Sequence, residues 1–338
     1  MPIPVLRKAP EVPVPSGPQP PQKVHWGRTY VSITGKNGKG EEIILTNFHD
    51  ARWPDIIMMP GATGLDAPPF EIHSDDSPNL DGGMFRDARA VAREIMIPLY
   101  LHGIDRRTVK QLKSQLVSAL NPKKGFCVLK FIEGDAVPRY LKCYYKSGME
   151  GSEAEDQSGF TWKKFGIQLT AFDPYFYSDD VQVAEWSFGT GEAFLHPTSF
   201  FPLHLNAGIV LGSAIDVSNP GDVEAWPRWE LTGPIKGFKF TSPEIEKPDG
   251  SKTTYTFGIT ADGSGTDIVP AGRVLTIDTR PGFKSLRDDQ NTNYWPLLDD
   301  SPQLWFLPEG DSQCTVDIVP GSSNAKVRLT FQPRYEGY

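Results

Sequence analysis

The sequence predicts a mainly β protein with more than one folded domain, on three observations. The chain has 338 residues, which exceeds the size at which a single hydrophobic core usually stops growing. Its 32 glycines and 31 prolines are numerous for a globular protein, and they separate many short runs of β-favouring residues. Helical spacing of apolar residues occurs in one good segment. We therefore expect antiparallel strands joined by turns, with one helix.

Residues 25–178 are expected to form an α+β domain. Side chains alternate from Tyr30 to the glycine-rich turn at 36–40, and apolar residues resume at Ile43, which indicates a hairpin. Strict alternation from Arg93 to Leu101 specifies a strand with one buried face. We expect further strands at 126–132, 139–145 and 160–172, turn-rich loops at 60–70, 75–83 and 148–159, and a domain boundary near Ser178.

The one helix is expected to begin after Asp105, a suitable N-cap, and to end at Asn121-Pro122. One face of the helix is apolar and the other is basic. The basic face fits a solvated or subunit-facing surface better than a nucleic-acid helix. The apolar positions are Val109, Leu112, Leu116, Ala119 and Leu120, and the opposite face carries Arg106, Arg107, Lys110, Lys113 and Gln115.

Residues 179–338 are nearly all β in pattern. Short alternating runs follow one another without intervening helices, which favours an antiparallel sandwich. The strands are expected at 215–217, 229–231, 236–240, 253–260, 273–278, 301–306, 313–319 and 326–331.

The chain starts with a proline-rich segment, residues 1–24. Proline fixes φ and donates no backbone hydrogen bond, so this segment is expected to be extended. Two interpretations stay open: a solvated tail, or an arm that lies on a neighbouring subunit.

The net charge of −8 argues against a general nucleic-acid binder, because phosphate binding depends mainly on clustered Lys and Arg. The first residues lack the apolar core of a secretory signal, and no apolar run is long enough to cross a bilayer. We therefore expect synthesis and folding in a cytosol, with no membrane insertion.

The search for chemistry finds no catalytic motif, no metal site and no cofactor site. The glycine-rich turn at 35–40 has neither phosphate-loop nor dinucleotide spacing, so a hairpin tip is expected. The three cysteines, Cys127, Cys143 and Cys314, are expected to be reduced and buried, with the first two facing each other across a hairpin. The histidines lack metal-ligand spacing, and each is interpreted as structural or surface: His25, His49, His73, His102, His196 and His204.

Paired acids and tryptophans leave two alternatives open. Adjacent acids on a strand point to opposite faces, so loop solubility explains the pairs Asp75/Asp76, Asp179/Asp180, Asp288/Asp289 and Asp299/Asp300. A glycan hydrolase would need two convergent carboxylates, which the pattern does not single out. A carbohydrate-binding module would use exposed aromatics, for which the candidates are Trp186, Trp226, Trp229, Trp295 and Trp305.

Several separated segments together resemble the distal tail proteins of long-tailed bacteriophages. The most informative is 219–233, in which Asn-Pro-Gly-Asp turn residues precede a short strand around Trp229. The others are 61–70, 80–83 with Arg86 and Arg93, 172–177, 275–282, 304–312 and 327–331. The similarity covers roughly residues 40–338. The chain departs from the pattern in its proline-rich start and in the long segment 186–211.

This resemblance implies a structural protein of the virion tail tip that is synthesised in the host bacterial cytoplasm and is not an enzyme. It implies a belt domain related to tail-tube proteins at 25–178 and a galectin-like β-sandwich at 179–338. Six belt domains are expected to close into a ring that joins the tail tube to the tip. The implied partners are the major tail tube protein, the tape measure protein and tail-tip hub or fibre proteins. DNA is expected to pass through the lumen without specific binding, because an acidic ring repels it.

Overall fold

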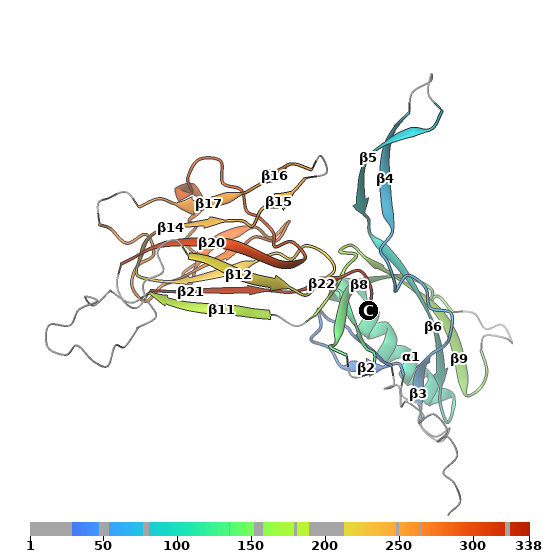
Figure 1. Ribbon diagram of the computed structural model, residues 1–338. Helices are drawn as coiled ribbons and strands as arrows, with labels where there is room; N and C mark the ends of the chain where they lie inside the picture. Colours follow the sequence, from blue (N-terminus) through green and yellow to red (C-terminus); the bar gives the residue numbers. More distant parts are fainter. Residues whose placement is uncertain are drawn as a thin grey trace, which may run out of the picture.

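The described part of the computed structural model has two hydrophobic cores. Each core is built on β-sheets, whose arrangement is seen in Figure 1. The first core takes its buried residues from Val31 to Phe176, and the second from Val217 to Phe331. The predicted mainly β class is confirmed. The structure describes residues 29–46, 54–76, 81–134, 136–151, 158–178, 181–188, 213–247, 250–261, 263, 265–321 and 325–338, without the side chains of 181–188 and 213.

The first core lies on a nine-stranded sheet whose main path runs β2-β1-β7-β8-β9-β6-β3. The predicted alternation is confirmed in β6, where Ile95, Ile97 and Leu99 are buried. The strands are β1 (Tyr30–Thr34), β2 (Glu42–Ile44), β3 (Asp55–Met58), β6 (Arg93–His102), β7 (Cys127–Ile132), β8 (Arg139–Ser147), β9 (Trp162–Ala171), β10 (Phe176–Tyr177) and β22 (Arg334–Tyr335).

The predicted helix, α1 (Arg106–Leu120), contacts strands β6 and β9 of this sheet. The Asp105 carboxylate caps the helix and accepts hydrogen bonds from the Thr108 amide and hydroxyl, at 2.7 and 2.6 Å. A short 3₁₀ turn, η1 (Pro122–Lys124), follows. Arg106, Arg107 and Lys110 are exposed, as the surface interpretation of the basic face requires.

Strands β4 (Phe70–Asp76) and β5 (Gly83–Ala90) form a two-stranded ribbon that projects from the first sheet (Figure 1). The predicted loop at 75–83 is therefore too long, because Asp75 and Asp76 belong to β4 and pair with Met84 and Gly83. The rest of the ribbon, like β3, was not expected from the sequence.

The second core lies between a five-stranded sheet, β11-β21-β13-β18-β19, and a four-stranded sheet, β12-β20-β14-β17. The predicted sandwich is confirmed. The strands are β11 (Val181–Phe188), β12 (Ser213–Asn219), β13 (Arg228–Thr232), β14 (Ile235–Thr241), β17 (Thr256–Ile259), β18 (Val274–Asp278), β19 (Ser285–Asp288), β20 (Gly310–Pro320) and β21 (Ala325–Phe331), beside the small pair β15 (Ile245–Glu246) and β16 (Lys252–Thr253) and the 3₁₀ turn η2 (Trp295–Leu297).

The predicted strand at 301–306 is wrong. This stretch runs irregularly across the core and buries Trp305, while Leu307 forms an isolated bridge with Ala225. Pro302 and Pro308 donate no backbone hydrogen bond, so a regular ladder cannot form at either end. Strands β11 and β19, which the sequence pattern did not indicate, complete the five-stranded sheet.

The last residues return to the first sheet. After β21 ends at Phe331, β22 pairs with β10, with Tyr335 opposite Phe176. Tyr338 then packs against Phe131, with ring centroids 4.8 Å apart. Residues 334–338, which we call the C-terminal tail, thus join the first core although they follow the sandwich in sequence.

Candidate assembly surfaces

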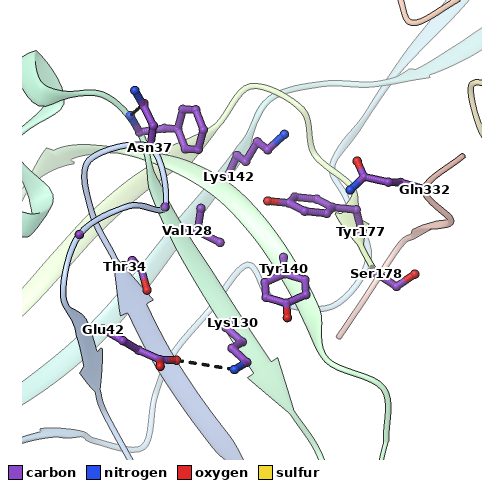
Figure 2. A pocket seen from close by; sticks show the side chains of 13 residues that line it. Thr34, Asn37, Glu42, Val128, Lys130, Tyr140, Lys142, Tyr177, Ser178 and Gln332 are labelled. Atoms are coloured by element: carbon purple, nitrogen blue, oxygen red, sulfur yellow. Dashed lines mark hydrogen bonds and ion pairs between the residues drawn. The ribbon is translucent and has the colours of Figure 1, made fainter. Parts of the chain in front are cut away.

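A groove of about 760 Å³ lies on the outer face of the first sheet (Figure 2). Side chains that alternate along strands β7 and β8 decide which residues line the groove. Leu129 and Leu141 point into the core, whereas their neighbours Lys130 and Lys142 point outward. The groove is lined by Thr34, Asn37, Gly38, Gly40, Glu42, Phe126, Val128, Lys130, Tyr140, Lys142, Tyr177, Ser178 and Gln332, and we call it the aromatic–lysine groove.

Aromatic rings and lysine side chains are interleaved along this groove. The Tyr140 and Tyr177 rings stack with centroids 5.7 Å apart. The Lys142 ammonium lies 4.8 Å from the Tyr177 ring centroid and 5.8 Å from that of Phe126. Burial raises the pKa of Tyr177, so its hydroxyl is neutral at any physiological pH. The groove therefore presents flat apolar surfaces together with positive charge.

The β1–β2 hairpin forms one wall of the groove, and its tip is the glycine-rich turn. Lys36, Asn37 and Gly38 all have positive φ there, which confirms the predicted hairpin tip. The Asn37 side-chain oxygen accepts a hydrogen bond from the Phe126 amide at 3.0 Å, which fixes the turn against β7.

Glu42 is the acidic residue of the groove lining. Its carboxylate accepts a hydrogen bond from the Ser32 hydroxyl at 2.6 Å and lies 3.7 Å from the Lys130 ammonium (Figure 2). The Ser32 hydrogen bond and the charge of Lys130 lower the pKa of Glu42. Glu42 is therefore ionised and orients Lys130 at the base of the groove.

The β4–β5 ribbon is the second unusual surface, because its two faces differ. Register places Phe70, Ile72 and Phe85 on one face together with Ala88 and Ala90, and Ser74 and Asp76 follow on the same face toward the tip. The other face carries mainly charged residues, including the ion pair between Arg89 and Glu71 at 2.6 Å. The three large residues of the apolar face are 49%, 65% and 67% exposed. The ribbon is thus amphipathic and uncovered.

A β-bulge in β5 creates this segregation. The register shifts between His73 and Ser74, so that no residue of β4 lies opposite Arg86 in the strand pairing. Because side-chain direction alternates along a strand, the extra residue moves Phe85 onto the face of Phe70 and Ile72. The Arg86 guanidinium reaches Asp75 on the charged face, with Nε and the carboxylate 2.5 Å apart.

Arg93, which is 1% exposed, attaches the C-terminal tail to the first core. Its guanidinium donates to the backbone carbonyls of Gly64 and Asp66, at 3.2 and 2.7 Å, and to that of Glu336 at 2.5 Å. Burial lowers the pKa of Arg93, which nevertheless stays cationic because a guanidinium is so strongly basic.

Arg139 and Arg334 hold the rest of the tail. The Arg139 guanidinium stacks 3.6 Å from the Tyr335 ring centroid and donates to the Gly337 carbonyl at 2.8 Å. The Arg334 guanidinium lies 2.9 Å from Asp173 on the side of the first sheet and 3.4 Å from Glu224 on the side of the sandwich. Arg334 therefore bridges the two parts of the chain.

The Asn-Pro-Gly-Asp turn at 219–222 packs against the same tail. The buried Asn219 side-chain amide donates to the carbonyls of Val223 and Pro308, and its oxygen accepts from the Gly221 amide at 3.1 Å. A Cβ on Gly221 would lie 2.4 Å from the Arg334 carbonyl oxygen. Glycine is required here because the tail passes so close.

The cysteine predictions are confirmed. Cys127 and Cys143 lie directly opposite each other across the β7–β8 hairpin, and all three cysteines are free and buried. Burial raises the pKa of the Cys127 thiol to about 12 and that of Cys314 to about 11. The thiols are therefore protonated and unreactive at neutral pH.

The structure does not bring the histidines together. His73 lies on the ribbon and His102 at the end of β6, whereas His25, His49, His196 and His204 fall outside the described residues. Within the described part of the chain, no group of three or more His, Cys, Asp or Glu side chains is placed to hold a metal ion. No helix in that part is both long and apolar enough to span a bilayer.

Loop solubility is the wrong interpretation for three of the acidic pairs, the first of which, Asp75 and Asp76, lies in strand β4. Asp288 is buried, forms an ion pair with Arg273 and accepts hydrogen bonds from the amides of its own loop. Asp299 caps the end of β17 by accepting from the Thr260 amide and hydroxyl, at 3.0 and 2.9 Å. Both stabilise backbone, a role that spacing alone does not reveal. Asp179 and Asp180 lie outside the described residues.

Two of the five candidate tryptophans are core residues. Trp229 and Trp305 are buried and pack edge to face, with ring centroids 5.9 Å apart. Trp226 packs against Phe306, and Trp295 is 41% exposed. The side chain of Trp186, in β11, lies outside the described part. The tryptophans thus do not make one aromatic platform among the described side chains.

Structural comparison identifies the class of fold. The chain matches SPP1 Dit, described as a paradigm of the hub adsorption apparatus in phages that infect Gram-positive bacteria, with a TM-score of 0.56 and 12% identity over 90% of this chain and 98% of that one. A chain of the phage P2 baseplate, in its activated conformation with Ca, matches with a TM-score of 0.52 and 11% identity over 92% of this chain and 100% of that one.

The chain therefore has the fold of a Dit-like phage tail protein along nearly its whole length. The structure of the same baseplate with Sr gives a TM-score of 0.51 at 10% identity. By sequence, no protein family and no curated protein matches the chain. The resemblance predicted from the short motifs is confirmed at the level of the fold.

Proposed function

We propose that this protein is a structural component of a bacteriophage tail tip, a distal tail protein of the virion and not an enzyme. The fold it shares with SPP1 Dit and the P2 baseplate chain, at full length of those chains, supports this role. Among the described residues, the thiols are buried, Asp288 and Asp299 bind backbone amides, and Trp229 and Trp305 lie in the core, so these side chains have structural roles.

In this proposal six copies close into a ring, and the main ring contacts come from residues 25–178. The observation that carries it is the uncovered apolar face of the β4–β5 ribbon. A two-stranded ribbon alone is marginally stable, so an amphipathic one requires a surface to cover it. In this ring the sandwich of residues 179–338, a galectin-like domain, faces outward, except that the C-terminal tail belongs to the first core.

The ring joins the tail tube protein on one side to hub or fibre proteins on the other, with the tape measure protein and DNA in its lumen. Native mass spectrometry and electron microscopy of the purified protein, alone and with the tail tube protein of the same phage, test the proposal. We expect a six-fold ring. A protein that stays monomeric at high concentration with and without the tube protein contradicts it.

The proline-rich arm, residues 1–24, lies outside the described residues. We propose that this arm belongs to neither hydrophobic core. Deletion of residues 2–22 should leave cooperative thermal unfolding unchanged, because proline bars the segment from regular core structure. A weaker ring in the truncated protein would favour an arm on a neighbouring subunit over a solvated tail. A lost unfolding transition would contradict the proposal.

A further inference from the structure

We propose that the apolar face of the β4–β5 ribbon of one copy docks into the aromatic–lysine groove of a second copy of this chain. This inference rests on the proposed ring and names the two surfaces that meet. Each surface is incomplete by itself: the ribbon exposes Phe70, Ile72 and Phe85, and the groove exposes an aromatic face of the first sheet.

The two surfaces are complementary in charge. Residues 70–90 contain five acidic residues and two arginines, an excess of three negative charges. Both arginines are already paired within the ribbon, with Asp75 and Glu71. The groove and its hairpin wall, residues 36–42 with Lys130 and Lys142, carry four lysines and two glutamates. The net charges of the two surfaces are therefore opposite, which favours their encounter, although most of the acidic residues lie on the face of the ribbon that does not dock.

The ribbon is long enough to reach a second copy. A strand of seven residues is about 23 Å long, so the ribbon extends well beyond the body that carries it (Figure 1). The outward-facing sheet surface that carries the groove offers rings such as Tyr140 and Tyr177, against which aliphatic and aromatic side chains pack.

A second copy is the occupant because both halves of the contact lie on one chain and differ from each other. Two different, complementary surfaces on the same chain generate a head-to-tail interface, which repeats from copy to copy and closes into a ring when the rotation between copies allows it. One face of a ribbon this size covers on the order of 200 Å², against the roughly 800 Å² per partner of a stable interface. The ribbon therefore adds to other contacts and does not form the ring alone.

Photo-crosslinking tests the pairing directly. A photoreactive phenylalanine analogue replaces Ile72 in unlabelled protein, which is mixed with ¹⁵N-labelled wild type so that only links between copies are counted. We expect links to peptides within 126–142. The analogue in place of Val117, which is exposed on α1, is the control and should not link to those peptides.

Substitutions provide a second measurement. Combined Phe70→Ser, Ile72→Ser and Phe85→Ser should raise the concentration for half-assembly at least about tenfold, since three exposed anchors are lost. The change Lys142→Glu should act in the same direction. Phe283 and Lys239 are exposed in the sandwich, so Phe283→Ser and Lys239→Glu are the matched controls. They should leave the concentration for half-assembly unchanged.

The outcomes separate this inference from the ring itself. A ring that forms with position 72 linked to some other surface overturns the ribbon–groove pairing and leaves the proposed function standing. Links to 126–142 in dimers or open chains, with no closed ring, support the pairing and contradict the ring. The absence of any link between copies, or unchanged assembly of the triple variant, overturns the pairing.

Discussion

The β7–β8 hairpin and the β4–β5 ribbon are both antiparallel pairs with one apolar face, and they differ in what lies against that face. Leu129 and Leu141 in the hairpin are fully buried in the first core, whereas Ile72 in the ribbon is 65% exposed. The hairpin also pairs with β1 and β9 at its two edges, and the ribbon forms a separate two-stranded sheet. Amphipathic alternation specifies an apolar face, but the rest of the assembly decides what covers it.

The largest expected difference between the two regions is in thiol reactivity. Cys127 should be alkylated at pH 8 at least about a thousandfold more slowly than a cysteine introduced by Ile72→Cys, because burial raises the pKa of Cys127 to about 12 and excludes the reagent. Mass spectrometry of iodoacetamide-treated monomer measures both rates. In the assembled ring the cysteine at 72 should become protected as well. Rapid labelling there would show that the ribbon stays uncovered after assembly.

Truncation of a core side chain should have the next largest effect. Leu141→Ala should lower the free energy of unfolding by about 3 kcal/mol, because it removes a fully buried side chain and leaves a cavity. Ile72→Ala should change it by less than about 0.5 kcal/mol in the monomer. Urea denaturation at a concentration below assembly measures both. Equal losses at the two positions would mean that the ribbon packs within its own chain.

The C-terminal tail packs against the first core, unlike the ribbon, which projects away from it. Truncation after Pro333 should lower the stability of the first core by about 2 kcal/mol, because the buried Arg93 loses a carbonyl acceptor and Phe131 loses the Tyr338 ring. Hydrogen exchange followed by mass spectrometry resolves the two cores, and β13 and β14 should stay protected. Glu336→Ala, which keeps the carbonyl that Arg93 uses, is the control and should behave as wild type.

The smallest expected effect is a pH dependence at the groove wall. The pKa of Glu42 is lowered in the folded state, chiefly by the Ser32 hydrogen bond, so its contribution to stability is present above its usual value of 4.5 and is lost as the pH falls through the lower folded pKa. With 42% of the side chain exposed, we expect less than about 0.5 kcal/mol. Denaturation of wild type and Glu42→Gln between pH 3 and 6 checks this, and identical curves would exclude the contribution.

The contrast between hairpin and ribbon also shows what sequence patterns can predict. The alternation of β6, the cap and face of α1, and the hairpin that contains Cys127 and Cys143 were predicted because each depends on residues close in sequence or on a regular period. The ribbon was missed because the bulge at Arg86 breaks the period of two within β5, between Phe85 and Asp87. The predicted strand at 301–306 was wrong because its apolar residues suggested a half-buried strand. In the structure an irregular segment buries Trp305 instead.

The sequence by itself determined the mainly β class, the helix after Asp105, the sandwich in the second half and the resemblance to phage distal tail proteins, since all of these follow from local periodicity, turn chemistry and short motifs. Only the tertiary structure decided where the C-terminal tail goes, why Gly221 and Arg93 are needed, and that the ribbon and the aromatic–lysine groove are both exposed. These features join residues up to 243 positions apart, and a pattern in one stretch of chain carries no information about which distant stretch packs against it.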